Sequence, residues 1–290
     1  MKKVIPVLLA VLFSDFSYAQ KVYTVKYESR FKIKTMYAGS TKYFKLICYV
    51  PNDIENVQKV KEMTFSDEPD TVFVEGDNKF AVFTLEDLAP EHEIIIGITM
   101  DIFLNDLTTR LKSGVFIRED SLAPFLIDEK YIETNDEHIR AAASKLRGKE
   151  TLKTVKYTYD FVNKHLTYEK SAEENGALAA LKSGKGDCSE FSDLFVALCR
   201  ANNIPARTIS GYTLDYLDFG KHSWAEVYLD QCGWVRFEPI RRNNATFKKT
   251  INAYIQLVSG KNNSILKNYL YYCEYLGKPV EVINYYVLKL

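Results

Sequence analysis

The sequence has no excess of either charge, no metal-binding cysteine pattern and no internal repeat. Lysine and arginine number 38, and so do aspartate and glutamate, so the charge balance gives no sign of a nucleic-acid partner. The absence of a CxxC motif or a Cys/His cluster with zinc-like spacing argues against a structural metal site, and no cofactor is expected. The chain is long enough for two ordinary domains with hydrophobic cores.

The N-terminus has the pattern of a signal peptide. Two lysines precede the apolar stretch Val4 to Phe13, and the small residues Ser17 and Ala19 resemble a signal-peptidase site. This stretch is too short to cross a bilayer, which takes about 20 residues. No cysteine lies at its end, which argues against a lipid anchor, and an apolar N-terminal strand is the alternative reading. We predict a signal peptide at 1–19 and a periplasmic or secreted protein without a membrane anchor after its removal.

Five cysteines are present, and an odd number leaves at least one thiol unpaired within the chain. Cys188 and Cys199 are eleven residues apart in a helical pattern. That spacing is about 16 Å along a helix axis, which is too far for a disulfide between them. Pairings that involve the other cysteines stay open: Cys48, Cys232 and Cys273.

The first part of the chain after the apolar stretch has a period-two hydrophobic pattern, from Val22 to about Ile102. The sequence Glu75-Gly76-Asp77-Asn78-Lys79 stands between two strand-like runs and is a hairpin signal. We predict an antiparallel β-sandwich-like domain over residues 20–125. Its end, Leu104 to Leu126, is expected to be a linker with little regular structure.

The pattern then becomes helical and later strand-like again. Thr134 and Glu137 match a capping box, and apolar residues from Leu152 to Leu166 repeat at helical spacing. From Ala206 onward strand patterns dominate to the end of the chain. Helices followed by strands within one unit predict an α+β fold, which we assign to residues 126–290.

Cys188 stands at the predicted start of a helix. Asp187 can serve as the N-cap and Glu190 completes a capping box, which places Cys188 in the first turn. The helix dipole and the unpaired backbone N–H groups of a first turn stabilise a thiolate, and the same N–H groups can bind the oxyanion of a tetrahedral intermediate. The alternative is a buried structural thiol or half of a disulfide, although a packing cysteine more often sits further along a helix, as Cys199 does.

His222 and Glu238 lie in two strand-like runs on either side of a turn that ends at Gly233. If the turn has three residues, even-numbered positions lie on one face of the two strands, which places His222, Glu226 and Glu238 together. Glu226 is therefore an alternative to Glu238 as the carboxylate that pairs with His222. Counting from the turn does not place His222 directly opposite Glu238, so a bulge or a register offset is expected. A thiol, an imidazole and a carboxylate are the groups that a cysteine nucleophile needs, whereas a lone strand histidine is as often structural.

Several stretches around these residues, in this order and spacing, resemble the transglutaminase-like superfamily. They are Gly186-Asp187-Cys188-Ser189-Glu190-Phe191, His222-Ser223-Trp224-Ala225-Glu226-Val227 and Gly233-Trp234-Val235-Arg236-Phe237-Glu238-Pro239. More loosely, the predicted helices and the final strands are similar to the rest of that domain. The β-rich N-terminal half is similar to domains that often precede it in exported bacterial proteins.

The resemblance implies a papain-like core in which Cys188 is the nucleophile, His222 is base and acid, and Glu238 orients His222. The family usually has aspartate where this chain has Glu238, and the extra methylene implies a slightly different position of the imidazole. Trp224 is expected either beside His222 or simply in the sheet core.

The leading hypothesis is an exported cysteine-dependent acyl-transfer enzyme that acts on amide bonds in a protein or peptide. Hydrolysis by a peptidase or amidase is favoured over amine transfer, because no acidic loop with calcium-ligand spacing occurs. The alternative is a binding or assembly module that keeps the fold without turnover, which a disulfide from Cys188 to Cys232 or Cys273 would favour. A glycan-binding protein is a third possibility that rests on the aromatic content alone.

Overall fold

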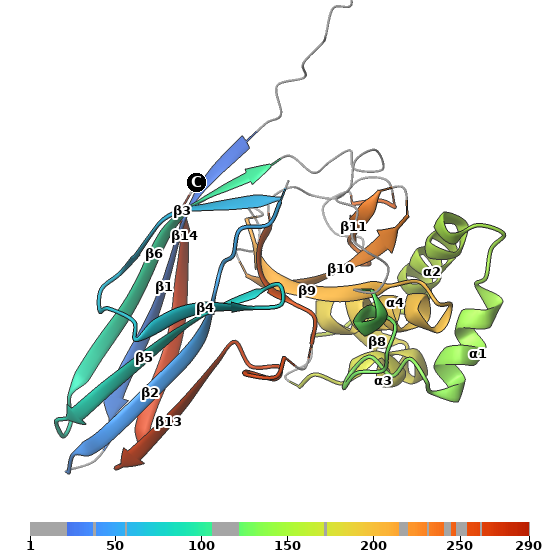
Figure 1. Cartoon of the computed structure of the whole chain (residues 1–290). Helices are drawn as coiled ribbons and strands as arrows, with labels where there is room; N and C mark the ends of the chain where they lie inside the picture. The colour runs from blue at the N-terminus through green and yellow to red at the C-terminus, as the bar shows by residue number, and fades with distance from the viewer. Residues whose placement is uncertain are drawn as a thin grey trace, which may run out of the picture.

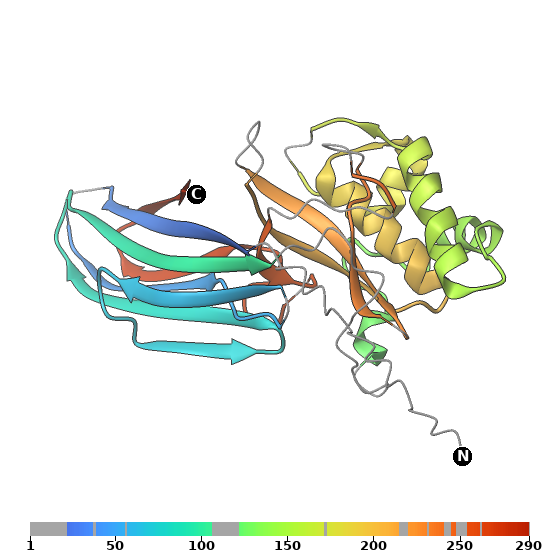
Figure 2. The same ribbon diagram turned by 90° about the horizontal axis from the view of Figure 1, so that it is seen from above.

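The computed structural model describes residues 22–36, 39–55, 57–105, 122–170, 173–214, 220–230, 232–240, 245–247, 254–261 and 263–289. The predicted signal peptide and most of the predicted linker lie outside these residues. Figures 1 and 2 show a β-sandwich at one end, helices at the other and a further sheet between them. Within the described part of the chain, no helix is long and apolar enough to cross a membrane.

The sandwich consists of two four-stranded antiparallel sheets, ordered β14-β1-β6-β3 and β13-β2-β5-β4. Inward-facing apolar residues alternate along the strands as predicted: Ile96, Ile98 and Met100 of β6 are buried, with more exposed residues between them. The predicted hairpin is confirmed, since Glu75 pairs with Asn78 across the turn between β4 and β5. The strands of the N-terminal half are β1 (Val22–Thr35), β2 (Thr41–Val50), β3 (Gln58–Phe65), β4 (Thr71–Glu75), β5 (Asn78–Leu88) and β6 (Glu93–Asn105).

The last two strands also belong to the sandwich. β13 (Tyr271–Gly277) pairs with β2, and β14 (Val280–Lys289) pairs with β1. The predicted unit 126–290 is therefore wrong at its C-terminal end, because the chain returns to supply one edge strand to each sheet. A period-two pattern identifies a strand but does not say which sheet it joins.

The helices cover one side of the middle sheet, whose strand order is β11-β10-β9-β12. Helix α4 lies at the centre of this unit, and its residues from Glu190 to Arg200 are all buried. The α+β arrangement predicted for this part of the chain is present. Its elements are α1 (Glu137–Lys145), α2 (Thr151–His165), α3 (Gly176–Ser183), α4 (Cys188–Ala201), β9 (Ala206–Thr213), β10 (Lys221–Leu229), β11 (Gly233–Phe237) and β12 (Tyr254–Ser259), with a 3-10 turn η2 (Ala123–Phe125) and a short parallel pair β7 (Thr167–Tyr168) and β8 (Lys185–Gly186).

The start of α1 differs from the predicted capping box. Asp136 is the N-cap, and its carboxylate accepts hydrogen bonds from the backbone N–H groups of His138 and Ile139. Thr134 instead donates its hydroxyl to the carbonyl of Ile132 and is buried. Aspartate is a stronger N-cap than threonine, so the start of the helix at Asp136 agrees with the capping preference of its residue type.

Candidate active site

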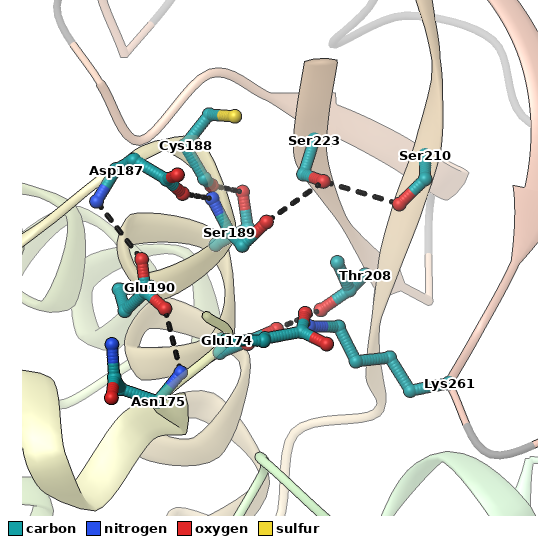
Figure 3. A network of polar contacts seen from close by, with 12 residues as sticks. Glu174, Asn175, Asp187, Cys188, Ser189, Glu190, Thr208, Ser210, Ser223 and Lys261 are labelled. Carbon is teal, nitrogen blue, oxygen red and sulfur yellow. Dashed lines mark hydrogen bonds and ion pairs between the residues drawn. The ribbon is translucent and has the colours of Figure 1, made fainter. Parts of the chain in front are cut away.

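Cys188 is the first residue of α4, as predicted. The carboxylate of Asp187 accepts the backbone N–H of Ser189 at 2.8 Å, and the carboxylate of Glu190 accepts the backbone N–H of Asp187 at 2.9 Å. These are the two halves of a capping box. The Cys188 side chain is half-buried and points away from Asp187, toward the side on which β10 carries Ser223 (Figure 3). The cap thus fixes the thiol at the positive end of the helix dipole.

Glu190 also ties the helix start to the segment before α3. Its second oxygen accepts the backbone N–H of Asn175 at 2.9 Å (Figure 3). Burial opposes ionisation of this carboxyl, but the N–H donors of Asn175 and Asp187 outweigh burial and lower the pKa of Glu190. Gly186 allows this fit, because a Cβ there would lie 2.3 Å from the Cβ of Glu190.

His222 and Glu238 form a buried pair. The Nε2 atom of His222 lies 2.8 Å from Oε2 of Glu238, and the two side chains are 1% and 0% exposed. With the proton of the neutral ring on Nε2, the Nδ1 atom is left with a lone pair, and this buried atom has no hydrogen-bond partner. Burial lowers the pKa of His222, but Glu238 and the Cys188 side chain together raise it to about 10.

The register between β10 and β11 differs from the expected one. Leu229 pairs with Gly233 and Ala225 with Phe237, with no bulge between them, and continuing this ladder places Glu238 opposite Trp224. His222 is therefore the diagonal neighbour of Glu238 on the same face. The predicted shared face is confirmed, and the expected bulge or offset is not needed because the glutamate side chain spans the diagonal.

Glu226, the rival carboxylate, is occupied elsewhere. Its Oε2 atom accepts hydrogen bonds from Nε and Nη2 of Arg207 at 3.0 and 2.8 Å. Arg207 also pairs with Asp77 of the sandwich and lies over the ring of Trp234, with 4.3 Å between the guanidinium carbon and the ring centroid. Through Arg207, Glu226 thus connects the middle sheet to the sandwich. Glu238 is the carboxylate that pairs with His222.

The helix start and the His222 strand meet beside the thiol. The Ser189 and Ser223 hydroxyl oxygens, each next in sequence to Cys188 or His222, lie 3.5 Å apart (Figure 3). The contribution of the Cys188 side chain to the raised pKa of His222 is a second sign of their proximity. None of the five cysteines is in a disulfide bond, so the structure holds none of the disulfides that the sequence left open.

Two residues around this pair, Tyr254 and Arg236, were given no role from the sequence. The Tyr254 hydroxyl donates a hydrogen bond to Oε2 of Glu238 at 2.6 Å. The Trp224 ring stacks on Tyr254 with centroids 4.9 Å apart, and the Arg236 guanidinium lies over the Trp224 ring at 4.9 Å. Trp224 is fully buried beside His222, so it is both a sheet-core residue and a neighbour of the imidazole.

A second buried polar cluster lies further along α4 (Figure 3). Asp193 is fully buried and accepts hydrogen bonds from Nζ of Lys261 at 2.6 Å and from the Thr208 hydroxyl at 3.1 Å. Lys261 also pairs with Glu174. Burial raises the pKa of Asp193, Lys261 opposes this and Glu174 adds to it, with a result of about 7. In the described ranges, no group of at least three His, Cys, Asp or Glu side chains is arranged to hold a metal ion.

Comparison with known proteins agrees with this geometry. Residues 140–239 match the Transglutaminase-like superfamily. The chain contains a transglutaminase-like domain. A stretch of 99 residues is 34% identical to the uncharacterized protein YebA of Bacillus subtilis, and it covers 29% of this chain and only 13% of the length of that protein.

The transglutaminase-like domain and the sandwich together have a structural counterpart. A crystal structure of a candidate cysteine protease from Cytophaga hutchinsonii aligns with a TM-score of 0.65 and 17% identity over 92% of this chain and 91% of the other. The periplasmic domain of TgpA from Pseudomonas aeruginosa aligns with a TM-score of 0.40 and 14% identity, over 72% of this chain and 88% of that domain. The Cytophaga structure supports the two-part fold described above.

Proposed function

We propose that the protein is an exported cysteine-dependent enzyme that hydrolyses amide bonds in a protein or peptide, with Cys188, His222 and Glu238 as its catalytic residues. The observation that carries the proposal is the buried pair of His222 and Glu238 at 2.8 Å, which leaves the Nδ1 atom of the ring unpaired near a capped thiol. An imidazole oriented by a carboxylate beside a cysteine is the arrangement that activates a thiol nucleophile.

The first half of the reaction forms a thioester. The Nδ1 atom of His222 takes the thiol proton of Cys188, and the thiolate attacks the amide carbonyl carbon. The carbonyl oxygen becomes an oxyanion at the start of α4, where Asp187 already accepts the N–H of Ser189, so we assign the backbone N–H of Cys188 as a donor. The imidazolium then protonates the leaving nitrogen, the C–N bond breaks, and an amine departs.

The second half releases the acyl group. Neutral His222 takes a proton from water, and the hydroxide formed attacks the thioester carbon. The C–S bond breaks, the carboxylic acid leaves, and Cys188 ends as the thiol or as the thiolate paired with the imidazolium. Glu238 favours the imidazolium in both halves, because a buried carboxylate within hydrogen-bond distance stabilises the positive charge. An amine in place of water would give amine transfer by the same steps.

Product analysis tests the proposed reaction. The protein without its predicted signal peptide is incubated with a mixture of peptides and a labelled primary amine, and the products are read by mass spectrometry. We expect new peptide termini that depend on Cys188 and are absent in Cys188→Ser. The matched control is Cys232→Ser, which removes a buried thiol elsewhere in the same domain and should leave the products unchanged. If the labelled amine is attached in a Cys188-dependent way and no hydrolysis occurs, the protein is a transferase and not a hydrolase.

A further inference from the structure

Tyr254 contacts the His222–Glu238 pair, although no pattern in the sequence predicted this contact. It is the first residue of β12, a strand that comes after the β10–β11 hairpin in the chain and lies beside β9 in the sheet. Its hydroxyl donates to Oε2 of Glu238 at 2.6 Å, and that oxygen also lies 2.8 Å from Nε2 of His222. One carboxylate oxygen thus takes both hydrogen bonds, while Oε1 of Glu238 is buried without a partner.

The ring of Tyr254 is itself held in place. It lies nearly parallel to the Trp224 ring, at 15°, and both rings are almost fully buried. The Arg236 guanidinium lies over both rings, 4.9 Å from the centroid of Trp224 and 5.6 Å from that of Tyr254. Among the described residues, none of the three guanidinium nitrogens has a hydrogen-bond partner, and Oε1 of Glu226 lies 4.0 Å from Nε. The guanidinium therefore interacts mainly with the ring faces.

We infer that Tyr254 is a positioning residue that holds the Glu238 carboxylate in place, so that His222 stays oriented toward Cys188. The inference deepens the proposed function and rests on it. A glutamate has one more rotatable bond than an aspartate, so its carboxylate needs more support to hold one position. Tyr254 supplies that support, and the Trp224–Arg236 stack keeps the hydroxyl in place.

Loss of this hydroxyl has a definite chemical consequence. Without the Tyr254 hydroxyl, Oε2 of Glu238 keeps its hydrogen bond to His222 but loses the second hydrogen bond that fixes its position, so the carboxylate is free to turn away from the imidazole. A displaced carboxylate stabilises the imidazolium less, so His222 takes the proton of Cys188 less readily. The charged or titratable groups around His222 are Cys188 of α4, Tyr254 of β12, Arg236 of β11 and Glu238 directly after it.

The test is the rate at which iodoacetamide labels Cys188 between pH 4 and pH 10, in the whole mature chain and by peptide mass spectrometry. Tyr254→Phe keeps the ring stack and removes only the hydroxyl. We expect the midpoint of the pH–rate curve to rise by about one unit, which is about tenfold slower labelling below both midpoints. Site-specific 3-fluorotyrosine at position 254, a stronger donor of the same shape, should lower the midpoint.

Two comparisons make the result decisive. Tyr212→Phe removes a buried hydroxyl of the neighbouring strand that bonds Tyr27, so it should cost stability without moving the midpoint. Tyr254→Phe should also have no further effect when Glu238 is already glutamine. An unchanged or lowered midpoint in Tyr254→Phe overturns the inference, and so does an unchanged midpoint with fluorotyrosine. If the unaltered protein labels no faster than a free thiol, the proposed function itself fails.

Discussion

His222 and Glu238 are joined across a diagonal of the β10–β11 ladder, not across a direct pair. Their Nε2 and Oε2 atoms are 2.8 Å apart, although the register places Glu238 opposite Trp224. Diagonal neighbours on antiparallel strands are about 7–8 Å apart at Cα, which is far for a short side chain. The glutamate in place of the family's usual aspartate therefore fits this register, because its extra methylene covers the additional distance.

Glu238→Asp should lower the reactivity of Cys188. The shorter side chain does not reach His222 across the diagonal, and loss of a hydrogen bond to a charged group predicts about tenfold slower labelling by iodoacetamide at pH 6. The matched control is Glu226→Asp, which shortens a buried carboxylate on the same face of the sheet that pairs with Arg207. Equal labelling of Glu238→Asp and the unaltered protein would contradict the diagonal account.

Gly211→Ala should disrupt the sheet that carries the site. Gly211 pairs with His222 on one side and Gln256 on the other, and a Cβ there would lie 1.9 Å from the carbonyl oxygen of Ile255. The added methyl must push β12 away from β9, which we expect to cost about 3 kcal/mol in the free energy of unfolding and to move Tyr254.

Urea denaturation measures that cost. Gly97→Ala in the sandwich is the matched control, because its Cβ would meet Ser66 at 3.6 Å, an ordinary contact. If Gly211→Ala lowers the free energy of unfolding no more than Gly97→Ala does, β9 and β12 are not as close as described.

Asp193→Asn should destabilise the protein less at pH 8 than at pH 5. The folded-state pKa of Asp193, about 7, is above its ordinary value of 3.8, so its stabilising effect is present at low pH and is lost as the pH rises through 7. The pKa of Lys261 is also raised, and its contribution is constant in this range because it is fully present below 10.5. Urea denaturation at the two pH values checks this, with exposed Asp67→Asn as control. A greater loss of unfolding free energy in Asp193→Asn at pH 8 than at pH 5 would contradict this expectation.

The raised pKa of His222 predicts a further pH dependence. Cys188→Ser removes the coupled thiol and leaves Glu238 to stabilise the imidazolium. Because the folded-state pKa remains above the ordinary 6.5, the free energy of unfolding of Cys188→Ser should fall as the pH rises from 6.5 toward the folded-state value, by at most about 1.4 kcal/mol per pH unit. The double variant that also carries His222→Gln should lack this slope. Parallel curves for the two variants would show that Glu238 does not stabilise the charged ring.

Local signals in the sequence predicted the parts of the site that depend on near neighbours. The capping box at Asp187 and Glu190 lies within one helical turn, and the face shared by His222 and Glu238 follows from a short hairpin. Both were predictable because few conformations satisfy such short spacings.

Contacts between distant segments were not predictable in the same way. Tyr254 lies in β12, and the residues around it give no sign that this strand pairs with β9. Likewise, β14 pairs with β1, which comes from the opposite end of the chain. Strand patterns specify which face is buried, whereas the partner depends on the assembled core. The contact between Glu238 and its diagonal neighbour His222 was not predicted, because counting from a turn considers only residues that are directly opposite each other.

The most direct test of the central claim is the pH dependence of Cys188 labelling by iodoacetamide in the purified protein without its predicted signal peptide, compared with His222→Gln. If Cys188 is a nucleophile activated by His222, labelling should be fast at pH 6, well below the ordinary thiol pKa of about 8.5, and should slow about tenfold or more in the variant. Labelling that follows an ordinary thiol curve and does not change in His222→Gln would contradict the account.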